Sequence, residues 1–135
     1  MGIVARHLNP GGVMVLNYSG YRSGREARPL RSVTLTISTH LPWTLVIPCC
    51  QPGSYGNNII VAGREPVDLR SGPPPFPIPA HVMTELSSLV PMRLVGPAIL
   101  LTDEYNPLDP WSMEAHEEFR RVALRTTPWD VVLAE

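Results

Sequence analysis

Hydrophobic and polar residues alternate along residues 32–38, where Val, Leu and Ile are separated by Ser and Thr. Alternation with a period of two places the apolar side chains on one face of a strand, so this pattern predicts a half-buried strand over Ser32–Ser38. The apolar residues Trp43–Ile47 predict its hairpin partner, and Val13–Asn17 predicts a buried strand earlier in the chain. A turn is predicted at Ser19–Gly24, where serine and glycine gather.

Three segments carry helix signals. Asn57–Gly63 starts with residues that cap helices and ends on a glycine, so a short helix is predicted there. Proline suits the first turn of a helix, which predicts one helix over residues 80–89 after Pro79 and another from Asp109 to about Arg125. Short strands are expected at Val67–Arg70, Ala98–Leu101 and Trp129–Leu133.

The predicted elements are mainly strands, and the chain of 135 residues is the size of one domain. Strands with one apolar face and spacing compatible with hairpins favour an antiparallel sheet. We therefore expect a single mainly β or α+β domain, in which the sheet closes into a small barrel and the helices pack outside it.

Composition narrows the classes of partner. Hydrophobic residues make up 44% of the chain, charged residues 17%, and the formal net charge is -1, which argues against a general nucleic-acid or membrane-surface binder. The apolar stretches are too short for membrane insertion and the first residues do not resemble a secretory signal, so a cytoplasmic protein is expected. The adjacent Cys49 and Cys50 exclude a disulfide scaffold, and the four dispersed histidines have no metal-ligand spacing.

One short segment concentrates positive charge in this nearly neutral chain. Its four arginines recur at every third position: Arg22, Arg25, Arg28 and Arg31. Ser23 and Gly24 lie among them and are typical of a tight turn. Backbone N–H groups of such a turn, together with guanidinium groups, bind phosphate or another multiply charged anion. The alternative is a set of solvated surface arginines.

The order and spacing of three blocks resemble the deazaflavin-dependent nitroreductase family, whose members are small bacterial split β-barrel proteins. The first block is Ser19–Arg25, similar to the family's basic Ser-Gly motif. The second is Arg31–Val33, ahead of the alternating strand. The third is Asn58–Gly63 followed by Val67–Arg70, similar to the family's Asn-Leu-x-Ala-Gly helix and next strand. The resemblance covers roughly residues 13–72.

The resemblance implies a small split antiparallel β-barrel with flanking helices that binds the 5-deazaflavin coenzyme (coenzyme F420), with FMN as the alternative cofactor. The residues that match the family's phosphate-binding turn are Arg22, Ser23, Gly24 and Arg25. Arg28 and Arg31 are expected to reach the phosphate or the acidic tail. Pro48 and Cys49 would lie along the ring, and Asn58 would brace it.

The implied activity is hydride transfer between the reduced coenzyme and a small apolar acceptor such as a quinone, an enone or a nitro compound. Tyr55 and Tyr105 are candidates to polarise that acceptor. Two alternatives stay open: a barrel that binds a flavin or deazaflavin without turnover, and an arginine-rich turn that serves a protein interface. Related barrels with FMN are often dimers, so a homodimer is compatible with the resemblance.

Overall fold

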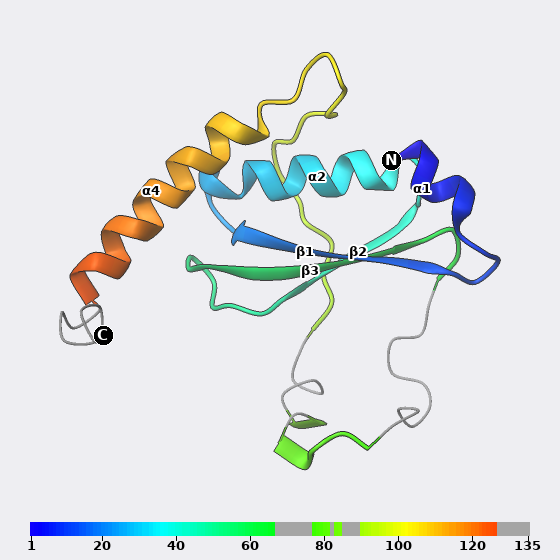
Figure 1. Ribbon diagram of the computed structural model, residues 1–135, viewed down its shortest axis with the longest axis horizontal. Coiled ribbons are helices and arrows are strands. Elements are labelled where there is room, and N and C mark those ends of the chain that lie inside the picture. The colour runs from blue at the N-terminus through cyan, green and yellow to red at the C-terminus, as the bar shows by residue number, and fades with distance from the viewer. Residues whose placement is uncertain (67–76, 82, 85–89, 127–135) are drawn as a thin grey trace, which may run out of the picture.

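The computed structural model describes residues 1–66, 77–81, 83–84 and 90–126. Figure 1 shows one helix lying over a small sheet and a long C-terminal helix at one side. In chain order the elements are α1 Gly2–His7, β1 Val13–Tyr21, the 3-10 helix η1 Arg25–Ala27, α2 Arg28–Ser38, β2 Trp43–Pro48, β3 Tyr55–Gly63 and α4 Leu108–Thr126.

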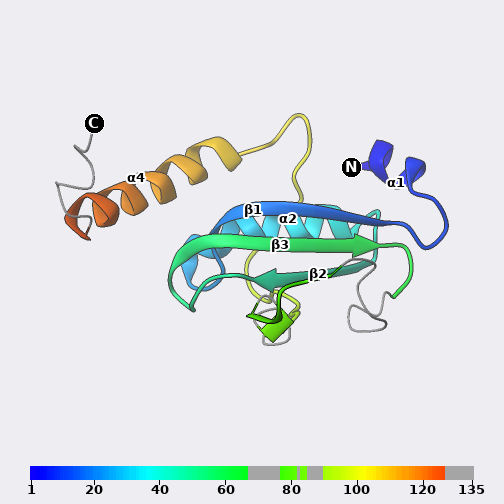
Figure 2. The same cartoon turned by 60° about the horizontal axis from the view of Figure 1, so that its bottom comes forward.

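The three strands form a sheet of order β1-β3-β2, with β3 antiparallel to both neighbours. β1 and β2 therefore run parallel, and α2 is the crossover that joins them. Figure 2 shows β1 and β2 on the two sides of β3. The class is α+β, as expected, but the sheet formed by the described residues is open and no barrel is seen.

The core lies between α2 and one face of the sheet. Leu16 of β1 and Val46 of β2 both stand opposite Ile60 of β3, and opposed residues share a face. The buried cluster consists of Ala5, Leu30, Val33, Ile37, Leu41, Val46, Ile60 and Ala62. Its members on α2 recur at helical spacing, so the helix buries one continuous stripe.

Residues 32–38 are helical, so the predicted strand is wrong. The helix directs three apolar side chains at the core: Leu30, Val33 and Ile37. The alternation had placed Leu35 on the same face as Val33 and Ile37, but Leu35 is 39% exposed. Proline in the first turn favours the helix. The hydroxyl of Ser32 donates to the carbonyl of Arg28 (2.9 Å), so this polar side chain is satisfied inside a helix.

The hydroxyl groups of α2 also bind an extended segment that runs along the helix. Ser32 Oγ accepts the N–H of Ile99 (3.1 Å), and Thr36 Oγ1 accepts the N–H of Leu101 (2.9 Å). A strand predicted at Ala98–Leu101 is therefore wrong, because these alternate amides pair with helix side chains instead of a neighbouring strand. The spacing fits because four residues of helix, from Ser32 to Thr36, span nearly the same length as two residues of extended chain, from Ile99 to Leu101.

Thr36→Val is expected to lower the free energy of unfolding by about 1–2 kcal/mol, because the N–H of Leu101 loses its acceptor while the side-chain volume is kept. The control is Thr39→Val, whose exposed hydroxyl donates to the carbonyl of Thr36 one turn back in α2. Urea unfolding followed by circular dichroism measures both variants. Equal unfolding midpoints would show that the contact adds no stability.

The segment Asn57–Gly63 belongs to the central strand β3, so the predicted helix is wrong. The run Ile59–Val61 is β-branched and lies between two strands, with Ile60 and Val61 buried, and such residues are favoured in that position. The strand predicted at Trp43–Ile47 is confirmed as β2, although its partner is β3 rather than residues 32–38. The first predicted strand is also confirmed and extends to Tyr21, so the turn begins at Arg22.

The predicted C-terminal helix is confirmed as α4. Of the helix predicted over residues 80–89, the described residues Ala80, His81, Met83 and Thr84 are helical. The strands predicted at Val67–Arg70 and Trp129–Leu133 lie outside the described residues. Among the described helices, none combines the length and apolar character that crossing a membrane requires.

Candidate functional site

The arginine-rich turn follows β1 directly and packs against the loop between β2 and β3. Gly24 has a φ of 76°, a conformation that suits glycine. Ser23 Oγ accepts the backbone N–H of Gly53 (3.0 Å), so two segments thirty residues apart are joined. Burial raises the pKa of Cys50, and the positive charge of Arg22 acts against this rise. The turn and the Pro48–Cys49 region predicted to flank the coenzyme are thus neighbours.

Arg25 and Arg28 line a cavity between the start of α2 and α4, with a volume of about 470 Å³. Its walls are Tyr21, Arg25, Glu26, Arg28, Pro29, Trp111, Glu114 and Glu118. The guanidinium carbon of Arg28 lies 4.7 Å from the ring centroid of Trp111, a cation–π contact that joins the two sides. The cavity therefore combines two aromatic rings, two cations and three carboxylates.

Arg31 is engaged by the protein itself. The residue is 9% exposed; its Nε donates to the carbonyl of Pro97 (3.0 Å) and its Nη1 to the carbonyl of Gly24 (3.0 Å). Gly96 lies against it: with φ at 130°, a Cβ added there would be 3.3 Å from the guanidinium carbon. The side chain ties the turn to the segment that lies along α2, so its geometry is that of an internal brace.

Asn58 is fully buried in β3, directly between Tyr18 of β1 and Pro48 of β2. Its Nδ2 donates to the carbonyls of Gly20 (3.0 Å) and Gly56 (3.1 Å), and more weakly to Tyr18 (3.4 Å). Its Oδ1 has no hydrogen-bond partner among the described residues. The amide joins two strands from inside the sheet, and it lines neither of the described cavities.

Tyr55 lies in an aromatic cluster that docks α4 on the ends of β1 and β3. Its ring stacks on Phe119, with centroids 4.8 Å apart, and meets Tyr21 edge-on at 5.5 Å. Burial raises the pKa of Tyr55, so the phenol stays protonated at neutral pH and can donate a hydrogen bond. Tyr105, by contrast, is exposed in a loop where it pairs with Thr102, and it lines neither described cavity.

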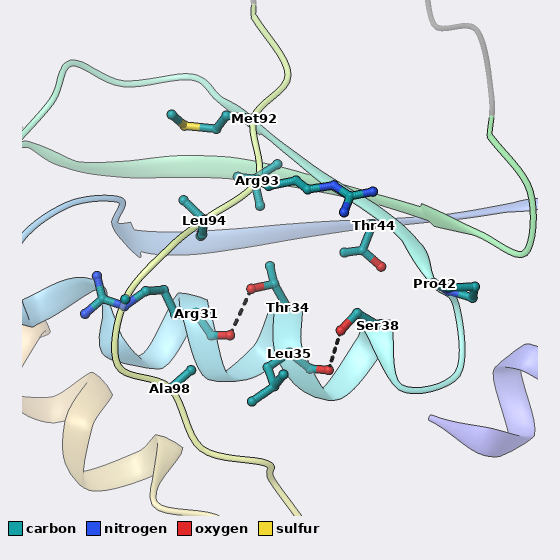
Figure 3. A pocket seen from close by; sticks show the side chains of 12 residues that line it. Arg31, Thr34, Leu35, Ser38, Pro42, Thr44, Met92, Arg93, Leu94 and Ala98 are labelled. Carbon is teal, nitrogen blue, oxygen red and sulfur yellow. Dashed lines mark hydrogen bonds between the residues drawn. The ribbon is translucent and has the colours of Figure 1, made fainter.

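A second cavity of about 230 Å³ lies between α2, β2 and residues 92–98 (Figure 3). Leu35, Met92 and Leu94 give it apolar walls, and Arg93 borders it. Of the residues predicted to bind the coenzyme, only Arg31 lines it.

The structure thus brings together some of the predicted residues and separates others. One cavity is lined by both Arg25 and Arg28. The adjoining turn holds Arg22, Ser23 and Gly24, and the neighbouring loop holds the exposed Cys49. The sequence interpretation missed the contribution of α4. Trp111, Glu114 and Glu118 recur at spacings of three and four, which places them on one helical face, and that signal could have found them.

Comparison with family models, curated proteins and solved structures gives no match.

Proposed function

We propose that this chain binds a flat anionic coenzyme of the flavin class in the cavity between η1 and α4, and that the 5-deazaflavin coenzyme is its first candidate ligand. The observation that carries the proposal is that the cations of Arg25 and Arg28 and the rings of Tyr21 and Trp111 line one cavity. Its volume of about 470 Å³ lies within the range of small-molecule sites.

The charges of the cavity define what the ligand must present. A phosphate is attracted by the guanidinium groups of Arg25 and Arg28, which both lie on the side of η1 and the start of α2. It is repelled by the carboxylate of Glu26 on that side and by those of Glu114 and Glu118 on α4, so the cations outnumber the carboxylates only on the η1 side. The phosphate is therefore expected on the η1 side, towards the turn at Ser23. The carboxylates also weaken the binding of any further negative group on the ligand. The affinity for FMN, which carries one phosphate and no acidic tail, should therefore be compared with the affinity for the longer acidic coenzyme.

Reductase activity is the second step of the proposal. The bound coenzyme would supply a hydride to an apolar quinone, enone or nitro acceptor, which also takes up a proton. The residues of this chain would bind the anionic end, hold the ring against Trp111 or Tyr21 and exclude water. Tyr55 carries its proton at neutral pH and its ring contacts Tyr21, which lines the cavity, so its hydroxyl is the candidate proton donor to the acceptor. The proposed binding does not require the split β-barrel of the nitroreductase family, because η1, the start of α2 and α4 supply most of the cavity walls.

Fluorescence titration of the purified protein with the deazaflavin coenzyme, FMN and inorganic phosphate tests binding. Saturable binding of either coenzyme that is stronger than binding of phosphate supports the proposal, and no binding of any of the three overturns it. Turnover with a panel of acceptors then separates a reductase from a binding protein, because both bind but only the reductase oxidises the reduced coenzyme.

Arg25→Ala and Arg28→Ala are each expected to weaken coenzyme binding about 10-fold to 100-fold, because a charge-assisted hydrogen bond contributes about 1.5–3 kcal/mol. Binding by each variant should also depend less on salt. Arg22→Ala is expected to have a smaller effect, since Arg22 does not line the cavity. Arg93→Ala is the control, because Arg93 is an exposed arginine at the other cavity. Equal affinity in all four variants would remove the arginines from the site.

A further inference from the structure

β1 is the outer strand of an open sheet, and it is unusually unprotected. Among the described residues its only strand partner is β3, on one side. Alternate residues of an antiparallel edge strand direct both N–H and C=O away from the sheet. Natural edges are blunted by charge, proline or a bulge, yet the nine residues VMVLNYSGY contain neither a charge nor a proline and pair with β3 without interruption.

The opposite edge of the sheet differs. The N–H and C=O of Val46 in β2 pair with the C=O and N–H of Met92, both at 2.8 Å, so the chain covers part of that edge itself. On β1, Val15 is 62% exposed and Val13 is 38% exposed. Figure 2 shows α1 and α4 near the two ends of β1 rather than along its length. No residue in the described part of the chain pairs with the outer side of β1, so the middle of this strand can accept another strand.

We propose that a second copy of this chain pairs antiparallel with β1 and makes a continuous six-stranded sheet. Pairing of all nine residues places the two-fold axis at Asn17, opposite Asn17 of the second copy, and sets Val15 opposite Ser19. The uncharged strand meets no like charge when it pairs with itself. At its ends, Arg22 of one copy comes opposite the uncharged Gly12 of the other in this register.

Sedimentation velocity of the full chain over a range of concentrations gives the first test. We expect a monomer–dimer equilibrium that Asn17→Lys shifts to monomer, because the exposed position 17 meets its own twin at the axis and two lysines there repel each other. Val95→Lys is the matched control, since Val95 is 89% exposed away from the strand, and this variant should behave as the unchanged protein. A protein that is monomeric at every concentration overturns the proposal, and pairing of this edge with a different protein would then be the remaining use of the strand.

Cysteine cross-linking tests the register. In a background of Cys49→Ser and Cys50→Ser, Asn17→Cys places two thiols opposite each other at the axis, where a disulfide can form. Ser19→Cys lies on the same strand and face, but its twin would be about 13 Å away. We expect rapid cross-linking of the first variant and little of the second, with circular dichroism showing that both are folded. Equal rates, or none in a dimeric protein, would overturn pairing through β1.

Discussion

Asn58→Asp is expected to destabilise the protein by about 3–5 kcal/mol at neutral pH, a large share of the roughly 5–15 kcal/mol that is typical of a folded domain. The amide nitrogen of Asn58 donates to the carbonyls of Gly20 and Gly56 and, more weakly, to that of Tyr18. An ionised carboxylate of nearly the same shape would point an oxygen at these acceptors in a fully buried position. It would lose every hydrogen bond of the side chain and gain repulsion in their place.

The effect should depend on pH in a defined direction. Because the ionised form is the unfavourable one, the pKa of the introduced carboxyl in the folded state lies above its unfolded value of about 3.9. The protonated acid can still donate one hydrogen bond, so the variant is most stable below that unfolded pKa. Its stability then falls as the pH rises towards and through the folded pKa. Urea unfolding at several pH values, relative to the unchanged protein, measures this slope.

Asn57→Asp is the matched control for this prediction. Asn57 is the exposed neighbour in β3, and its Oδ1 accepts a hydrogen bond from Ser19 (2.8 Å), which a carboxylate can also accept. Its effect is expected to stay within about 0.5 kcal/mol, as for most surface substitutions. If the two aspartate variants unfold at the same urea concentration, the buried amide does not join the strands as its geometry indicates.

The elements that the sequence predicted correctly are those with one dominant pattern. α4 starts at Leu108, one residue before the predicted Asp109, and has Asp109 and Pro110 in its first turn; the predicted parts of β1 and β2 are short apolar runs. Residues 32–38 carry two patterns at once, because Val33 and Ile37 fit both a strand face and a helical stripe with Leu30. The choice between them is made by the sheet surface on which α2 packs, and local sequence does not contain that information.

The central strand was misassigned for the complementary reason. Asn58 and Gly63 satisfy the rules for the start and end of a helix, but both partners of β3 come from distant segments, Val13–Tyr21 and Trp43–Pro48. A short apolar run flanked by such residues does not reveal by itself that strands pair on both of its sides.

The candidate site was predicted in part because the turn is local and its surroundings are not. The positions of Ser23 and Gly24 in a turn follow from residue type. Two contacts of the site depend on how distant segments fold back on the turn. The loop between β2 and β3 supplies the hydrogen bond from the N–H of Gly53 to Ser23, and α4 supplies the cation–π contact of Trp111 with Arg28. Equal spacing of the arginines also conceals their different roles, since η1 and α2 leave Arg25 exposed and bury Arg31.

Arg31→Met is expected to lower the free energy of unfolding by about 2–4 kcal/mol. Methionine keeps most of the apolar stem but removes the donors to the carbonyls of Gly24 and Pro97, and partly buried acceptors without a donor are costly. The guanidinium also fills the space beside Gly96, so its loss leaves a gap there. Chemical unfolding measures the difference, with Arg93→Met as the control because Arg93 borders the same cavity and is exposed.

The same variant distinguishes a brace from a ligand contact. If Arg31 holds the turn to the segment along α2, the folded fraction of Arg31→Met should bind the proposed coenzyme within a few-fold of the unchanged protein. Arg25→Ala, by contrast, should lose affinity for it with little loss of stability. A variant with unchanged stability and abolished coenzyme binding would reverse the assignment. The positive charge of Arg31 would then serve the ligand, and the cavity it borders beneath residues 92–98 would become the better candidate for the anionic end.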